Sequence, residues 1–130
     1  MKTLSYDDVY IGQNFMPVDF LITQELVDNY FAALQLDRTF YHELGVLPAA
    51  LIERCCRLPM LLKLTWPSTI HAEQYNEYYG TLKVGDVITA VASIKDKYVK
   101  NQRKYLKIEA TMKNDNDKLV GIATSTITLP

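Results

Sequence analysis

Cysteine is scarce in this sequence, and its placement excludes several classes of protein. Only two of the 130 residues are cysteines, and they are neighbours, Cys55 and Cys56. Adjacent cysteines do not form the disulfide framework of a small secreted domain, and they lack the spaced partners that a zinc site needs. We therefore interpret both as small buried residues and expect no metal site.

The chain also lacks a long uninterrupted hydrophobic run. Its most apolar stretch, residues 47–64, is broken by charged residues and by a proline, and therefore does not suit a membrane span. Residues 1–10 mix charges of both signs and contain no apolar core of a signal peptide. The sequence thus predicts a cytoplasmic protein without a membrane partner.

Neither sign of charge is in excess. Fourteen basic residues face fifteen acidic ones, which leaves a net charge of −1. Because binding to nucleic acid relies on a basic surplus, we expect no nucleic-acid partner. The sequence also contains no Gly/Ser-rich or Pro-rich linker and no repeat, so we predict one domain over residues 1–130.

Two helical patterns occupy the first half of the chain. Thr23 is a plausible N-cap, and apolar residues at helical spacing predict an amphipathic helix over residues 24–34. The residues expected on its buried face are Leu26, Tyr30, Phe31 and Leu34. Pro48 opens a second stretch that is apolar nearly all round, which is typical of a helix at the centre of a fold. We expect Pro59 to kink or restart this helix.

After Trp66 the hydrophobic period changes from helical to two, which indicates strands. The predicted strands form an antiparallel meander and span residues 70–79, 86–98, 104–113 and 119–129. A shorter candidate strand lies within residues 10–22. One buried helix followed by long strands predicts an α+β hot-dog fold, in which a curved antiparallel sheet wraps a long central helix. The open edge of such a sheet predicts pairing with a second chain.

Several segments, taken in order, resemble the MaoC-like dehydratases. They are residues 6–13, the His71-Ala72-Glu73-Gln74 segment, the Val84-Gly85-Asp86 turn and the basic hairpin over residues 100–105. The resemblance runs over nearly the whole chain and lies in the order and spacing of these segments. It implies binding of an acyl group on coenzyme A or on an acyl-carrier protein, with no cofactor. It also implies addition or removal of water at the second and third acyl carbons.

Catalytic members of this family carry the motif G-D-x-N-P-(I/L)-H after the first helix. Residues 36–42 keep the aspartate and the histidine five positions apart, as Asp37 and His42, but replace the glycine, asparagine and proline. The resemblance implies that both lie on a loop, where Asp37 orients or deprotonates a water while His42 shuttles the other proton. A one-residue gap aligns Tyr41 with the histidine instead, as in some non-catalytic members. Taken singly, Asp37 also fits a turn or cap residue and His42 a surface histidine.

The start of the second apolar stretch supplies candidate donors for the thioester oxygen. Unpaired backbone N–H groups at a helix start favour negative charge. The family uses a glycine amide after a proline at this place, and here Ala49 and Ala50 follow Pro48. We therefore expect the amides of Ala49 and Ala50 to form an oxyanion site.

Three functions compete at this stage. The leading one is an (R)-specific enoyl-thioester hydratase or 3-hydroxyacyl dehydratase of fatty acid metabolism, acting as a homodimer. The second is a non-catalytic subunit that pairs with a catalytic hot-dog partner in a hetero-oligomer. The third is an acyl-CoA thioesterase, because the same fold also hosts hydrolysis. Basic residues of the hairpin are candidates for phosphate contacts or for a solvated turn: Lys100, Arg103 and Lys104.

Overall fold

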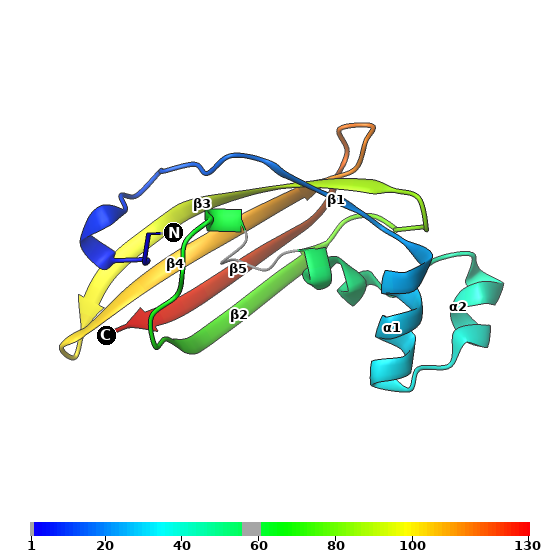
Figure 1. Ribbon diagram of the computed structural model, residues 1–130, viewed down its shortest axis with the longest axis horizontal. Coiled ribbons are helices and arrows are strands. Elements are labelled where there is room, and N and C mark those ends of the chain that lie inside the picture. Colours follow the sequence, from blue (N-terminus) through cyan, green and yellow to red (C-terminus); the bar gives the residue numbers. More distant parts are fainter. Residues whose placement is uncertain (1, 56–60) are drawn as a thin grey trace.

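A curved antiparallel sheet of five strands forms the body of the protein, with the strand order β1-β3-β4-β5-β2 (Figure 1). The computed structural model describes the backbone of residues 2–55 and 61–130 and the side chains of residues 2–52 and 61–130. The strands are β1 (Val18–Leu21), β2 (Ile70–Tyr78), β3 (Val87–Lys100), β4 (Arg103–Lys113) and β5 (Leu119–Leu129).

The helices gather at one end of the sheet (Figure 1). Helix α1 (Gln24–Leu34) and helix α2 (Arg38–Leu44) lie beyond that end, and the 3-10 helix η2 (Ala49–Cys55) lies between them and the sheet. A second 3-10 helix, η1 (Tyr6–Asp8), lies near the other end. Within residues 2–55 and 61–130, no helix is long and apolar enough to cross a membrane.

Helix α1 begins and ends as predicted from its capping residue and its period. The Thr23 side chain accepts a hydrogen bond from the backbone N–H of Leu26 at 3.1 Å, which satisfies one of the free donors of the first turn. The buried face differs in part from the prediction. Val27, Tyr30 and Phe31 are buried, whereas Leu34 is exposed because it sits in the last turn, away from the sheet.

The four predicted long strands are present within two residues of their expected bounds, but their order corrects the predicted meander. Strands β3, β4 and β5 are consecutive neighbours, whereas β2 pairs with β5 and forms the far edge. The connection over residues 79–86 is longer than a tight hairpin loop, so it can cross the ends of β5 and β4 before β3 begins.

The core lies against one face of β3 and β4, where every second side chain is buried. These residues are at most 1% exposed: Ile88, Ala90, Ala92, Ile94, Leu106, Ile108, Ala110 and Met112. The segment after Pro48 covers this face through buried Leu51, Ile52, Leu61 and Leu62. The sheet therefore wraps an apolar segment, as the hot-dog prediction requires.

The predicted long central helix is replaced, over the described residues, by shorter pieces. Residues 49–55 form η2, and the chain is helical again at residues 61–62. The N–H of Leu51 donates to the carbonyl of Pro48 at 3.0 Å, the three-residue spacing of 3-10 winding. This tighter turn brings Leu51 and Ile52 into the core together. The predicted kink at Pro59 and the predicted burial of Cys55 and Cys56 lie outside the described parts.

Candidate functional site

The segment predicted as a catalytic loop is a helix. Asp37 is the N-cap of α2, and its carboxylate Oδ1 accepts a hydrogen bond from the backbone N–H of Thr39 at 2.9 Å. Gly45 closes the helix with a φ of 68°, a left-handed conformation that glycine adopts without strain. The prediction of a loop is wrong because residues 37–45 carry both a start and a stop signal for a short helix.

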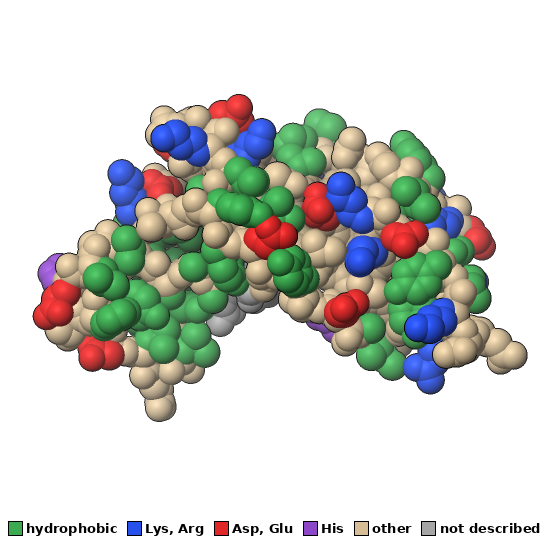
Figure 2. Space-filling view, turned by 180° about the vertical axis from the view of Figure 1, so that it is seen from behind, with side chains coloured by type: hydrophobic (Ala, Val, Ile, Leu, Met, Phe, Trp, Pro, Cys, Tyr) green, Lys and Arg blue, Asp and Glu red, His purple; other side chains and the backbone are tan. Residues whose placement is uncertain are grey.

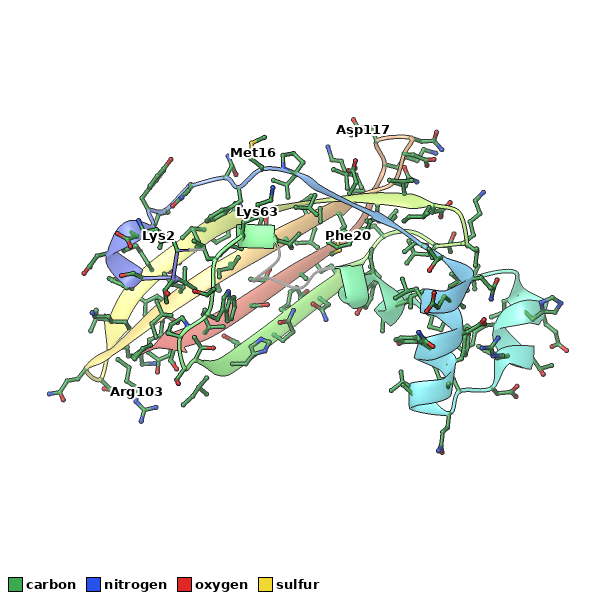
Figure 3. All side chains as sticks on the ribbon, in the orientation of Figure 1. Lys2, Met16, Phe20, Lys63, Arg103 and Asp117 are labelled. Carbon is green, nitrogen blue, oxygen red and sulfur yellow. The ribbon has the colours of Figure 1, made fainter. Side chains whose placement is uncertain are left out.

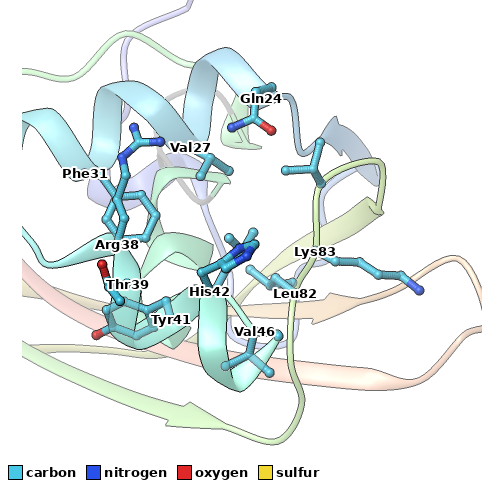
Figure 4. Close-up of a pocket in the computed structure, with 13 residues that line it drawn as sticks. Gln24, Val27, Phe31, Arg38, Thr39, Tyr41, His42, Val46, Leu82 and Lys83 are labelled. Atoms are coloured by element: carbon cyan, nitrogen blue, oxygen red, sulfur yellow. The ribbon is translucent and has the colours of Figure 1, made fainter.

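A cavity of about 460 Å³ lies where α1, α2 and the turn before β3 meet (Figure 4). Its apolar wall consists of Val27, Phe31, Tyr41, Val46, Leu47, Leu82 and Val84. Its more polar lining consists of Gln24, Arg38, Thr39, His42, Gly45 and Lys83. The volume falls in the range of sites that hold a small organic ligand, and the apolar wall suits a hydrocarbon chain.

His42 is one of the titratable residues that line the cavity, and its ring lies among the other lining side chains (Figure 4). It is the fifth residue of the seven-residue helix α2 and is exposed to solvent. An imidazole there can exchange protons with water and with a bound ligand. Lys83 also lines the cavity, but its ammonium group extends away from it (Figure 4).

Unlike His42, Asp37 does not line the cavity. Five positions along a helix correspond to about 140° around its axis, so Asp37 and His42 project in different directions. No carboxylate occurs among the described residues that line the cavity. The structure thus places His42 on the cavity and Asp37 at the helix start, and the paired catalytic role remains a prediction.

Ala49 and Ala50 lie just beyond the cavity wall. Leu47 lines the cavity, and η2 begins two residues later with Ala49 exposed and Ala50 half-buried. Neither alanine is among the described residues that line the cavity. Their predicted role as oxyanion donors also remains a prediction.

Helix α2 is tied to α1 by a set of contacts that sequence reasoning missed. Arg38 donates from Nη1 to Asp28 Oδ1 at 2.9 Å and lies with its guanidinium 5.0 Å from the centre of the Phe31 ring. The Gln24 amide donates to the same carboxylate oxygen at 2.9 Å. The hydrogen bond from Gln24 and then that from Arg38 lower the pKa of Asp28 below its ordinary value. The four-residue spacing of Arg38 and His42 places both on one helix face, but it gives no signal for the pairing of Arg38 with Asp28.

The space-filling view shows an arched molecule, hollowed underneath between the helical end and the far end of the sheet (Figure 2). Hydrophobic side chains gather on the helical end, at the left of that view. The basic hairpin is far from it, because Arg103 lies at the opposite end of the sheet from α1 and α2 (Figure 3). The fourteen residues of β3 that separate the two ends span about 46 Å in an extended strand.

Comparisons with known proteins place this geometry in context. A family model described as "FAS1-like, dehydratase domain region" matches residues 46–123, more than half of the chain. The matched range includes Ala49 and Ala50 and the segments at residues 71–74 and 84–86, and it begins after His42. No curated protein matches the sequence.

Solved structures with the same fold cover nearly all of the chain. The unliganded R-hydratase PhaJ1 from Pseudomonas aeruginosa superposes with a TM-score of 0.74 at 17% identity, covering 96% of this chain and 84% of that one. A monoamine oxidase regulatory protein from Archaeoglobus gives a TM-score of 0.83 at 12% identity, covering 99% and 95%. The HadBC (3R)-hydroxyacyl-ACP dehydratase complex from Mycobacterium tuberculosis gives 0.74 at 16% identity, covering 92% and 96%.

Proposed function

Because the chain belongs to the FAS1-like dehydratase-region family and has the MaoC-like hot-dog fold, we propose that it is an (R)-specific enoyl-thioester hydratase or 3-hydroxyacyl dehydratase. Its substrate in this proposal is an acyl thioester of coenzyme A or of an acyl-carrier protein. The observation that carries the proposal is the position of His42 on an apolar cavity.

The chemistry needs one group that moves protons close to the reacting carbons. Hydration adds the hydroxide of water to the third carbon of the enoyl group and a proton to the second. In our proposal His42 accepts the proton of the attacking water or delivers the proton to the second carbon, which is ordinary general acid–base work. The apolar wall next to it holds the acyl chain and limits competing water.

Asp37, Ala49 and Ala50 complete the proposed site. Asp37 orients the water in this account, and the amides of Ala49 and Ala50 stabilise the charge on the thioester oxygen. The supporting observation is their proximity along the chain, since Asp37 directly precedes Arg38 and Ala49 comes two residues after Leu47, and both Arg38 and Leu47 line the cavity. Both roles require a small rearrangement when the substrate binds, because Asp37, Ala49 and Ala50 are not among the described residues that line the cavity.

The test uses the purified chain with crotonyl-coenzyme A. We expect the enoyl absorbance to fall and the product to be the (R)-3-hydroxy thioester, identified by chiral chromatography. Release of the free coenzyme A thiol without hydration identifies a thioesterase instead. Unchanged absorbance with the chain alone contradicts a self-sufficient hydratase.

A non-catalytic subunit is the second candidate, and the position of Asp37 favours it. The carboxylate is bound to the Thr39 N–H and lies off the cavity wall, so a complete Asp–His pair is not assembled. In this case the cavity holds the acyl chain for a partner with its own catalytic pair. Activity that appears only after a catalytic hot-dog subunit is added supports this candidate.

We propose that strand β2 is where a second chain pairs, either another copy or a different hot-dog subunit. β2 is a sheet edge, and Ile70 and Tyr75 on it are each 61% exposed. The edge of a sheet presents backbone N–H and C=O groups to which another strand can pair, and β2 contains no proline, although it carries Glu73 and Glu77. Two of the similar structures are named as complexes of two different chains, HadBC and ChsH1-ChsH2.

Light scattering of the purified protein tests this pairing. A Tyr75→Lys variant places a charge on the edge, and we expect it to lower the mass toward that of one chain. Tyr10→Lys is the matched control, because Tyr10 is 65% exposed and lies outside the sheet. If both variants and the wild type have the same molar mass, and it is that of a dimer or a larger assembly, β2 is not the pairing edge.

A further inference from the structure

Helix α2 has few means of holding a fixed orientation by itself. It has seven residues, and none of them, all being described, is buried. An isolated helix of this length is unstable in water. Its direction, and with it the direction of His42, therefore depends on the contacts that α2 makes with α1.

The polar contacts among them converge on Arg38, the first residue of α2. Its two terminal nitrogens bind Asp28, Nη1 to the carboxylate at 2.9 Å and Nη2 to the backbone carbonyl at 3.4 Å. Its guanidinium carbon also lies over the Phe31 ring, 5.0 Å from the ring centre. A forked contact combined with stacking fixes the direction of an arginine more closely than a single ion pair does.

Asp28, the partner of Arg38, is held in place as well. Gln24 donates to Asp28 Oδ1 at 2.9 Å from one turn earlier on α1, so the carboxylate cannot swing freely. Phe31, whose ring receives Arg38, meets Tyr41 edge-on with 5.7 Å between ring centres. The Asp28–Arg38 clamp, as we call this pair, therefore joins the buried face of α1 to α2.

Arg38 of the clamp and His42 lie on the same face of α2. Residues four apart on a helix lie almost one above the other, so Arg38 and His42 project to the same side of α2. Both line the cavity (Figure 4). A rotation of α2 that releases Arg38 from Asp28 therefore turns His42 away from the cavity.

We infer that Arg38, held by Asp28, is a positioning residue that sets the His42 imidazole against the ligand in the cavity. This inference rests on the proposed hydratase function and adds the group that orients the proton-transferring residue. Misplacement of a reacting group by about 1 Å lowers rates by up to about 100-fold. Exposed ion pairs contribute little to unfolding, and the Arg38 and Asp28 side chains are 53% and 47% exposed. We therefore expect loss of the Asp28–Arg38 clamp to lower turnover and to leave the free energy of unfolding nearly unchanged.

The kinetic test compares Arg38→Met, which keeps an unbranched apolar stem but no charge, with Arg38→Lys, which keeps the charge but loses the fork. We expect kcat for crotonyl-coenzyme A hydration to fall at least 10-fold in Arg38→Met, with KM changed less than 3-fold and the same melting temperature. Arg38→Lys should recover part of the loss. Lys113→Met is the matched control, because it removes a solvent-exposed ion pair with Asp117 on the β4–β5 turn, far from the cavity, and should leave kcat unchanged.

A second readout does not require activity. The chain has two histidines, so the imidazole signals of His42 and His71 can be assigned by NMR. We expect Arg38→Met to change the set of methyl groups that show nuclear Overhauser effects to the His42 ring, and Arg38→Lys to retain it, with His71 unaffected. An unchanged set in Arg38→Met, or an unchanged kcat, overturns the inference. If the wild type is inactive but Arg38→Met still changes the methyl groups that show nuclear Overhauser effects to the His42 ring, the proposed function is wrong and the positioning role of Arg38 is retained.

Discussion

The sheet and the helical end of this protein differ sharply in how their residues are held. On β3 and β4 the core-facing side chains are at most 1% exposed, and the strands are joined along their whole length. On α2 no residue is fully buried, and the helix is held by two capping residues, the clamp and the contact of Tyr41 with Phe31. Stability therefore resides in the sheet, while the cavity is built at its loosely packed end. Binding and catalytic residues commonly sit on such ends, carried by a rigid scaffold.

The largest expected effect on stability comes from the sheet core. Ile108 is fully buried in β4, and Ile108→Ala removes three carbons that its neighbours cannot replace. We expect a loss of about 2–5 kcal/mol in the free energy of unfolding, measured by urea denaturation. Val99→Ala, on the exposed part of β3, should change it by less than about 0.5 kcal/mol. Similar losses for the two variants contradict the account of the core.

The contact between the covering segment and the sheet gives the next largest effect. A Cβ at Gly121 of β5 comes 3.2 Å from Ile52 Cδ1 and 3.3 Å from the carbonyl oxygen of Glu77. We expect Gly121→Ala to destabilise by about 1–3 kcal/mol through overpacking. Adding Ile52→Val removes the Cδ1 methyl and should restore part of the loss. A double variant that is no more stable than the sum of the two single losses predicts shows that Ile52 does not press on this site.

At the helical end the expected effects are smaller and local. Asp37→Ala removes the α2 cap and should destabilise that helix by about 1 kcal/mol, whereas Asp37→Asn keeps an oxygen acceptor and should change little. Faster hydrogen exchange at the α2 amides in Asp37→Ala alone is the expected result. The same pair of variants separates capping from catalysis, because a catalytic carboxylate loses turnover in both and a cap residue only in Asp37→Ala.

The smallest effect concerns pH. The pKa of Asp28 is lowered by its hydrogen bonds to Gln24 and Arg38, so folding favours the ionised carboxylate. Its contribution to stability is then present above the pKa of the unfolded chain and is lost as pH falls through the folded-state pKa, below about pH 4. We expect wild type and Asp28→Asn to differ slightly in melting temperature at pH 7 and to converge below pH 4. If the difference in melting temperature between wild type and Asp28→Asn instead grows as the pH falls, the lowered pKa of Asp28 is contradicted.

The sheet was largely predictable because its signals are local and repeated. Alternation along residues 104–113 gives the buried face of β4 directly, and the turn residues give the strand ends. The edge position of β2 was not predictable in the same way, since alternation says which face a strand buries and nothing about its neighbour. Over the described residues 49–55 and 61–62 the long central helix is not seen, and composition could not decide this, because an apolar segment has the same composition whether it winds as an α-helix or in shorter turns.

The candidate site was predictable in its position and not in its geometry. The segment over residues 36–42 does adjoin the cavity, and His42 lines it. The resemblance to a catalytic loop hid the capping signals at Asp37 and Gly45, which make the segment a helix and direct the two side chains apart. The clamp between Asp28 and Arg38 joins two helices, and no pattern within either one announces it.

Turnover of the His42→Ala variant tests the central claim most directly. Removal of a general acid–base group typically lowers the rate by about 100- to 10,000-fold, and the exposed position of His42 implies no loss of stability. We predict a fall of this size in kcat for crotonyl-coenzyme A hydration, with an unchanged urea midpoint. A variant that folds normally and hydrates the thioester at the wild-type rate contradicts the assignment of chemistry to the helical end.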